Sequence, residues 1–266
     1  MKVLIKLGGS LLDDPALCAS ISAQIAALIA DVPARVQAVV VHGGGKQMTR
    51  FLAERGVESH FVDGLRVTTP EVADAVLKVF AGSVNKQLAG ALLAAGAPAL
   101  GLSGIDGGLA VARQLNPALG AVGRVERVNS RLLDVLIEAG FLPVVACVAG
   151  GECGAVFNVN ADQMAVACAC AWKAEKLWFL TDIAGVKGAD GALIGRLMPS
   201  QARHLIETGV ATLGMQAKLE SACEALAHGI GEVRIAPGAE PDILARLVSA
   251  QTGAAPGTAL VPEQAA

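Results

Sequence analysis

The 266-residue sequence has no tyrosine, and aromatic residues make up only 3% of it. It also lacks any apolar run approaching the ~18 residues that a membrane-spanning helix needs. The N-terminus leads straight into the strand pattern of Lys2–Leu7, with no charged leader, apolar h-region and cleavage site, so we expect a cytoplasmic protein. The net charge is −3 and no basic block occurs. Nucleic acid and anionic membranes are therefore not expected as partners.

Cysteine and histidine are present, but not in metal-binding patterns. The six cysteines form no CxxC pair, and no histidine lies near them at the spacing of a zinc site. Buried, reduced thiols and no dedicated protein metal site are the prediction. Of the four scattered histidines, only His42 lies in a candidate site.

Two glycine turns stand out in the N-terminal half. The three valines at 39–41 predict a short buried parallel strand, which ends in His42-Gly43-Gly44-Gly45 before a helix over 46–55. Lys2–Leu7 predicts another such strand, with Lys6 near its end and Gly8-Gly9 after it. Free N–H groups at such turns bind anions, and parallel strands place both turns at one edge of a sheet. Either turn could also close its strand for structural reasons alone.

The remaining pattern alternates strands and helices, which predicts an α/β protein. Asp14 or Asp13 can cap a helix at 15–30, Asp63-Gly64 suits a hairpin turn, and Thr68 has capping-box spacing to Glu71. We expect a helix over 70–96 with a break near Gly82, strands at 97–102, 142–148, 176–180, 232–236 and 259–261, exposed antiparallel strands at 109–115 and 123–128, and helices at 130–139, 161–172 (capped by Asn160), 199–207, 215–228 and from Pro241. The pattern restarts at 173, which suggests lobes at 1–172 and 173–266 sharing one continuous sheet.

Seven motifs in order across nearly the whole chain make the sequence similar to the amino-acid kinase family. They are Lys6-Leu7-Gly8-Gly9, Val41-His42-Gly43-Gly44-Gly45, Asp63-Gly64-Leu65-Arg66-Val67-Thr68, Asn85-Lys86, Asn158-Val159-Asn160-Ala161-Asp162-Gln163, Thr181-Asp182 with Gly185-Val186, and Gly214-Met215 with Lys218. The resemblance implies a three-layer αβα sandwich around a central, mainly parallel open sheet. It also implies that the N-terminal lobe binds an acylated amino acid and the C-terminal lobe binds ATP.

The same resemblance implies an activity and its residues. The activity is ATP-dependent phosphorylation of the γ-carboxylate of N-acetyl-L-glutamate, a step of arginine biosynthesis, with Mg²⁺ bound through the ATP phosphates. Lys6 and Lys218 would stabilise the transferred phosphoryl group, and Asp162 would hold both ammonium groups. The expected substrate residues are Gly44, Gly45, Arg66 and Asn158, and the expected ATP residues are Gly8, Gly9, Asp182, Ile183, Ala184, Gly185, Val186, Lys187, Val210, Ala211 and Thr212.

The sequence leaves other hypotheses open. The substrate could be another acylated amino acid such as N-acetyl-aminoadipate, or the chain could be a non-catalytic amino-acid sensor on the same fold. We expect a homodimer formed through the apolar residues Val72, Val76, Val79 and Phe80, although that face could instead pack on its own sheet. Arginine-inhibited hexamers of the family carry a helix before the first strand. None precedes it here, so no feedback inhibition by arginine is expected.

Overall fold

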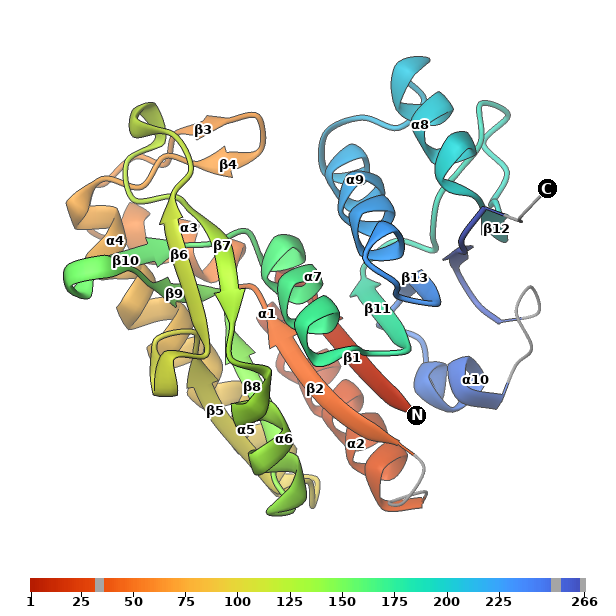
Figure 1. Cartoon of the computed structure of the whole chain (residues 1–266), viewed down its shortest axis with the longest axis horizontal. Coiled ribbons are helices and arrows are strands. Elements are labelled where there is room, and N and C mark those ends of the chain that lie inside the picture. Colours follow the sequence, from red (N-terminus) through yellow and green to blue (C-terminus); the bar gives the residue numbers. More distant parts are fainter. Residues whose placement is uncertain (32–35, 250–254, 264–266) are drawn as a thin grey trace.

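The computed structural model describes residues 1–31, 36–249 and 255–263, and within them eight strands form a central sheet (Figure 1). Neighbouring strands are parallel, except that β13 and β14 are antiparallel. In spatial order the strands are β12 (Arg196–Leu197), β14 (Thr258–Leu260), β13 (Glu232–Pro237), β11 (Lys176–Thr181), β1 (Lys2–Leu7), β2 (Gln37–His42), β8 (Leu142–Ala146) and β5 (Ala99–Ser103). The sheet is continuous across position 173, because β11 pairs directly with β1.

Helices cover both faces of this sheet, which makes three layers. One apolar core lies against α2 (Pro15–Asp31), α5 (Asn85–Ala94) and α10 (Ile243–Ser249). The other lies against α3 (Gly45–Ala53), α4 (Pro70–Val76), α6 (Ser130–Glu138), α7 (Ala161–Trp172), α8 (Pro199–Glu207) and α9 (Leu213–Ala227). A short α1 (Gly9–Asp13) follows β1, and 3₁₀ turns span Asp106–Gly108, Pro117–Leu119 and Glu152–Gly154. No helix among the described residues has the length and apolar character to cross a membrane.

Two smaller sheets stand beside the carboxyl ends of the central strands (Figure 1). One contains β10 (Val156–Asn158), β9 (Val148–Gly150), β6 (Ala110–Gln114) and β7 (Gly123–Val128), and the antiparallel pairing of β6 with β7 confirms the prediction for 109–128. The other is the hairpin of β3 (Phe61–Val62) and β4 (Leu65–Arg66). Its turn places both Asp63 and Gly64 at positive φ (49° and 77°), as a two-residue hairpin turn requires.

Three predictions for the long helical segment over 70–94 were wrong. The cap of α4 is Thr69, whose hydroxyl accepts a hydrogen bond from the Val72 amide; Thr68 instead turns inward and bonds to the Arg66 carbonyl. The chain does not break near Gly82, because a π-helical segment (Leu77–Val84) joins α4 to α5. One wider turn absorbs the irregularity without ending the helix.

The third error concerns the apolar face proposed for dimerisation. Val72, Val76, Val79 and Phe80 are all at least 95% buried within the single chain and belong to its own core. Periodicity places such residues on one face of a helix but cannot say whether that face packs on its own sheet or on a partner. These four side chains are therefore not available for a two-fold contact.

Candidate active site

The two glycine turns face one another at the carboxyl edge of the sheet. β1 and β2 are parallel neighbours, and α1 and α3 begin at Gly9 and Gly45. A Cβ added to Gly9 would lie 3.3 Å from the Gly45 backbone nitrogen. One added to Gly44 would lie 2.9 Å from Cδ1 of Phe80. The backbone therefore comes close at this point because side chains are absent, and two helix N-termini open toward the same space.

A buried aspartate joins two lysines from distant parts of the chain. Lys6 shares its face of β1 with Leu4 and points toward α7, whose first turn carries Asp162. The Lys6 ammonium lies 2.6 Å from Oδ1 of Asp162, and that of Lys218 on α9 lies 3.0 Å from Oδ2. Lys6 is 6% exposed and Asp162 is 5% exposed.

The two ammonium groups decide the charge of this carboxyl group. Burial by itself would raise the pKa of Asp162, but the nearby charges and hydrogen bonds of Lys6 and Lys218 outweigh it and hold the pKa below its usual range. Asn160 caps α7, as expected, by accepting hydrogen bonds from the Asp162 and Gln163 amides. The cap fixes the start of α7, so the carboxylate stays ionised and in place between the lysines.

Arg66 presents a buried cation without an acidic partner. Its guanidinium donates to the Gly45 carbonyl (3.2 Å), to the Thr49 hydroxyl (2.8 Å) and to the Ser59 hydroxyl, and it lies 4.6 Å from the centroid of the Phe61 ring. Among the described residues no carboxylate lies within ion-pair distance of it. Burial lowers the pKa of Arg66 by disfavouring its charged form. A neighbouring anion would relieve that cost.

Two neighbouring cavities share part of their lining, namely the hairpin residues and Asn160. The smaller, of about 210 Å³, is lined by Lys6, the three glycines 43–45, Arg66, Phe80 and Asn158. The larger, of about 830 Å³, lies between the β3–β4 hairpin and α9 and is lined by Asp162, Lys218 and Leu213. Asn158 donates a hydrogen bond to the Thr68 hydroxyl at 3.0 Å. The structure thus brings Lys6, Arg66, Asn158, Gly44 and Gly45 together, with Asp162 and Lys218 at the adjoining wall.

The residues expected on the ATP side are less closely gathered. Gly9 and Asp182 line a third cavity of about 620 Å³ together with Lys46. Val186 and Ala211 are buried in the core, and Lys187 and Thr212 are exposed. Of the nine residues in segments 182–187 and 210–212, only Asp182 lines one of the three cavities described so far.

Sequence reasoning missed several contributors. Phe61 lies opposite Arg66 in the hairpin, and that register follows from a two-residue turn at Asp63-Gly64. Thr49 lies one helical turn beyond Gly45, so its place near the glycine turn was also accessible from the sequence. Nothing in the local pattern places Phe80 against Gly44. That contact depends on how the long helix packs.

His42 has a structural environment. Its Nδ1 hydrogen bonds to the Gly43 carbonyl at 2.8 Å, and its Nε2 accepts from the Asn85 amide at 3.0 Å. Complete burial lowers the pKa of His42 to about 4, so the ring is neutral at pH 7. Asn85 also donates to the Leu102 and Val144 carbonyls, so this pair links β2, β5, β8 and α5.

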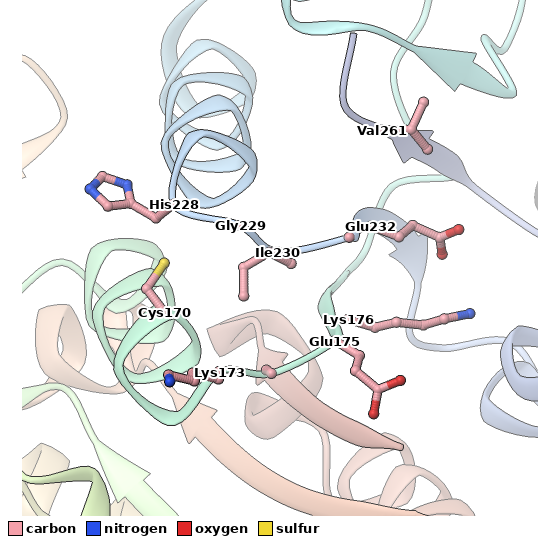
Figure 2. A pocket seen from close by; sticks show the side chains of 11 residues that line it. Cys170, Lys173, Glu175, Lys176, His228, Gly229, Ile230, Glu232 and Val261 are labelled. Atoms are coloured by element: carbon pink, nitrogen blue, oxygen red, sulfur yellow. The ribbon is translucent and has the colours of Figure 1, made fainter. Parts of the chain in front are cut away.

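Another cavity, of about 760 Å³, lies at the amino ends of the central strands (Figure 2). Its lining includes Lys176 and Glu232, the first residues of β11 and β13, and Lys173 and His228 just beyond α7 and α9. Because β11 runs parallel to β1, this cavity is at the end of the strands remote from Lys6. In the described part of the chain no three His, Cys, Asp or Glu side chains gather in a way that could hold a metal ion.

The profile of the amino acid kinase family matches residues 1–237. The chain belongs to the amino acid kinase family. The resemblance drawn from the seven motifs is thereby confirmed. Acetylglutamate kinase of Solibacter usitatus is 56% identical over 94% of this chain and 96% of its own length.

Solved structures agree on the family fold. An N-acetylglutamate synthase from Neisseria gonorrhoeae, solved with coenzyme A and N-acetyl-glutamate, matches with a TM-score of 0.87 and 25% identity; 99% of this chain is covered but only 60% of the synthase. A carbamate kinase from Giardia matches with a TM-score of 0.71 and 14% identity, over 98% of this chain and 99% of that one. The predicted αβα sandwich with a mainly parallel sheet is confirmed.

Proposed function

We propose that the chain is an acetylglutamate kinase, which transfers the γ-phosphoryl group of ATP to the γ-carboxylate of N-acetyl-L-glutamate, in arginine biosynthesis. The observation that carries the proposal is the Lys6–Asp162–Lys218 arrangement beside a cavity that contains Arg66. Acetylglutamate kinases at 56% and 42% identity over 94% of the chain support the choice of substrate.

The reaction needs cations and positioning more than a base. A glutamate γ-carboxyl group has a pKa near ~4.3, so it is already ionised at neutral pH and can attack phosphorus directly. Negative charge spreads over the phosphoryl oxygens in the transition state, where fixed cations stabilise it. Lys6 and Lys218 supply this charge from the two halves of the chain. Asp162 is engaged by both, so it organises them and accepts no proton.

The smaller cavity suits the acylated amino acid. Arg66 has free charge to offer an α-carboxylate, which a guanidinium can bind through two hydrogen bonds. Asn158 faces the same cavity and can bond to the carboxylate or the acetamide. The N–H groups at Gly44 and Gly45 add donors for the end of the substrate that reacts.

ATP is the co-substrate, and we place its phosphates at Gly8 and Gly9 and the rest of the nucleotide along 182–187 and 210–212. Anions bind favourably where helix N-termini and glycine amides open toward one space. Mg²⁺ would be held through the ATP phosphates and keep water in much of its shell, because both oxygens of Asp162 are already engaged by lysines. Arg66 and Lys6 then act on the acceptor and on the transferred group respectively.

An ADP-release assay with Mg²⁺ and a panel of acids tests the proposal. The panel contains N-acetyl-L-glutamate, N-acetyl-L-aminoadipate and unacetylated glutamate, and hydroxylamine traps the acyl phosphate product. A Lys6→Ala protein purified in parallel controls for contaminating kinases. N-acetyl-L-glutamate should give the highest kcat/KM. A higher kcat/KM for N-acetyl-L-aminoadipate would show that the longer acid is the substrate. ATP binding without any phosphoryl transfer would favour the hypothesis of a non-catalytic sensor.

We further infer a cytoplasmic homodimer. Since the apolar face around Val76 is buried within the chain, the dimer contact is placed instead at the edge of the central sheet that β5 forms. Leu100 on β5 is 38% exposed, and Leu93 on the adjacent α5 is 56% exposed. A second copy around a two-fold axis would cover both side chains. Light scattering of the purified protein tests this, and Leu93→Glu with Leu100→Glu should yield monomers if the assignment is right.

A further inference from the structure

A threonine far along the sequence braces the loop that follows β11. Thr258 of β14 is completely buried. Its hydroxyl accepts a hydrogen bond from the Val186 amide at 2.8 Å and donates one to the Ile194 carbonyl at 2.6 Å. The Ile194 amide in turn donates to the Val186 carbonyl at 2.9 Å. One hydroxyl therefore ties together the two ends of segment 186–194.

Glycines allow this close contact on both sides of the threonine. Gly185 has φ +145°, and a Cβ there would lie 2.7 Å from the Thr258 hydroxyl oxygen. Gly257 has φ +80°, and a Cβ there would lie 2.2 Å from the Ile235 carbonyl oxygen. The loop and the segment before β14 thus press on each other and on β13 through their backbones.

A buried ion pair holds the segment that leads into Thr258. Arg234 on β13 is 1% exposed, and its Nε lies 3.1 Å from Oε1 of Glu232. Its Nη1 donates to the carbonyls of Ala255 and Pro256, both at 3.2 Å. The contacts form a continuous series from this arginine through residues 255–258 to Val186.

We propose that Thr258 is a positioning residue for the nucleotide: it sets the conformation of segment 182–187 and so the affinity for ATP, without contacting ATP or the reacting groups. The proposal rests on the proposed function, in which that segment binds ATP. A valine would keep the shape of Thr258 but leave the buried Val186 N–H and the part-buried Ile194 carbonyl without their hydroxyl partner. Unsatisfied buried groups drive the loop to another conformation in which water or other groups can reach them.

The substitution Thr258→Val tests this by the pattern of its effects. We expect the KM and Kd for ATP to rise about tenfold, the change that ~1.4 kcal/mol of lost binding free energy produces. The KM for the acyl amino acid should stay within about twofold. Thr258→Ser keeps the hydroxyl and should restore ATP affinity, which a loss of packing alone would not predict.

Thr68→Val is the matched control, because it also removes a buried hydroxyl. Thr68 donates to the Arg66 carbonyl and accepts from Asn158, on the side of the acyl substrate. It should raise the KM for the acyl amino acid and leave the Kd for ATP nearly unchanged. Equal effects of the two variants on both substrates would overturn the proposal.

Hydrogen exchange covers the case in which Thr258→Val does not fold. In the wild-type protein the Val186 amide should exchange as slowly as the amides of β14; exchange at the rate of an open loop would overturn the assignment. Titration with ATP distinguishes a failure of the proposed kinase function from a failure of the role proposed for Thr258. If the wild-type protein binds ATP but transfers no phosphoryl group, the proposed kinase activity is refuted, and the ATP affinity of Thr258→Val still decides the role of Thr258. Unchanged ATP affinity in folded Thr258→Val refutes only the positioning role of Thr258. Absence of ATP binding in the wild type refutes both.

Discussion

Replacing Asp162 by asparagine should destabilise the protein strongly, because it leaves the buried ammonium group of Lys6 and the partly buried one of Lys218 without their shared counter-charge. The carboxylate lies 2.6 Å from the Lys6 nitrogen and 3.0 Å from that of Lys218. At an effective dielectric constant of about 20, Coulomb's law gives roughly 6 kcal/mol of attraction for each contact. Desolvation of the three charged groups costs several kcal/mol apiece, so the intact triad contributes little net stability.

The variant loses both attractions while two of the desolvation costs remain. The two ammonium groups also repel each other, and at the same dielectric constant two like charges ~5 Å apart repel by ~3 kcal/mol. Structural relaxation and water penetration weaken these electrostatic energies, and removing one partner of a buried ion pair typically costs ~3–5 kcal/mol, which is the loss expected here. For a chain of this size that corresponds to a fall in Tm of roughly 6–20 °C.

Thermal melts at pH 7 measure the effect against two comparison proteins. Asp134→Asn removes a half-exposed partner of Lys2 and should change the free energy of unfolding by ~1 kcal/mol or less. A triple replacement of Lys6 by Met, Asp162 by Leu and Lys218 by Met removes every charge of the triad and should recover much of the lost stability. The triple variant should nonetheless be inactive. A Tm for Asp162→Asn within 2 °C of wild type would refute the reasoning.

Further outcomes follow from single residues. Lys6→Ala and Lys218→Ala should each lower kcat by ~10²–10³ with little change in KM, since we propose that both cations act on charge that develops in the transition state; an unchanged kcat would remove that lysine from the proposed mechanism. Arg66→Ala should raise the KM for the acyl amino acid far more than the KM for ATP, and Arg66→Lys should rescue it only in part, because an ammonium group lacks the planar fork. Burial lowers the pKa of His42 to about 4 from ~6.5 in the unfolded chain, so the unfolded state binds more protons between these values. Urea titrations should therefore show stability falling as pH drops from ~6.5 toward 4, and a His42→Gln variant should flatten that dependence, whereas His60→Gln at an exposed position should not. Gly44→Ala places a methyl group 2.9 Å from the Phe80 ring and should reduce kcat/KM, and adding Phe80→Leu should recover part of it; no change in the single variant would show that the turn has room to spare.

Local chemistry made some elements predictable in detail. The ranges 161–172 and 199–207 were predicted for α7 and α8 and observed unchanged. Each start carries a local signal, Asn160 as a cap for one and Pro199 in the first turn of the other. The Asp63-Gly64 turn could likewise be predicted, because few residue pairs accept two successive positive φ angles.

Local chemistry was insufficient where neighbours in space compete with neighbours in sequence. Two adjacent threonines could each cap α4, and the structure uses Thr69 because Thr68 is drawn inward to Arg66 and Asn158. The apolar face of the helix around Val76 could be predicted from the sequence, but the elements that pack against it could not.

The sequence by itself determined the chemical groups available and the family to which the chain belongs: lysines at the end of a strand and on a helix, an aspartate in a capped first helical turn, and glycines where strands end. Only the tertiary structure decided that Lys6, Asp162 and Lys218 meet. Placing β11 beside β1 brings the C-terminal half against the first strand, and packing α7 on α9 sets the aspartate between the lysines. The physical reason is that these distances depend on packing across the whole core, which no short window of sequence contains.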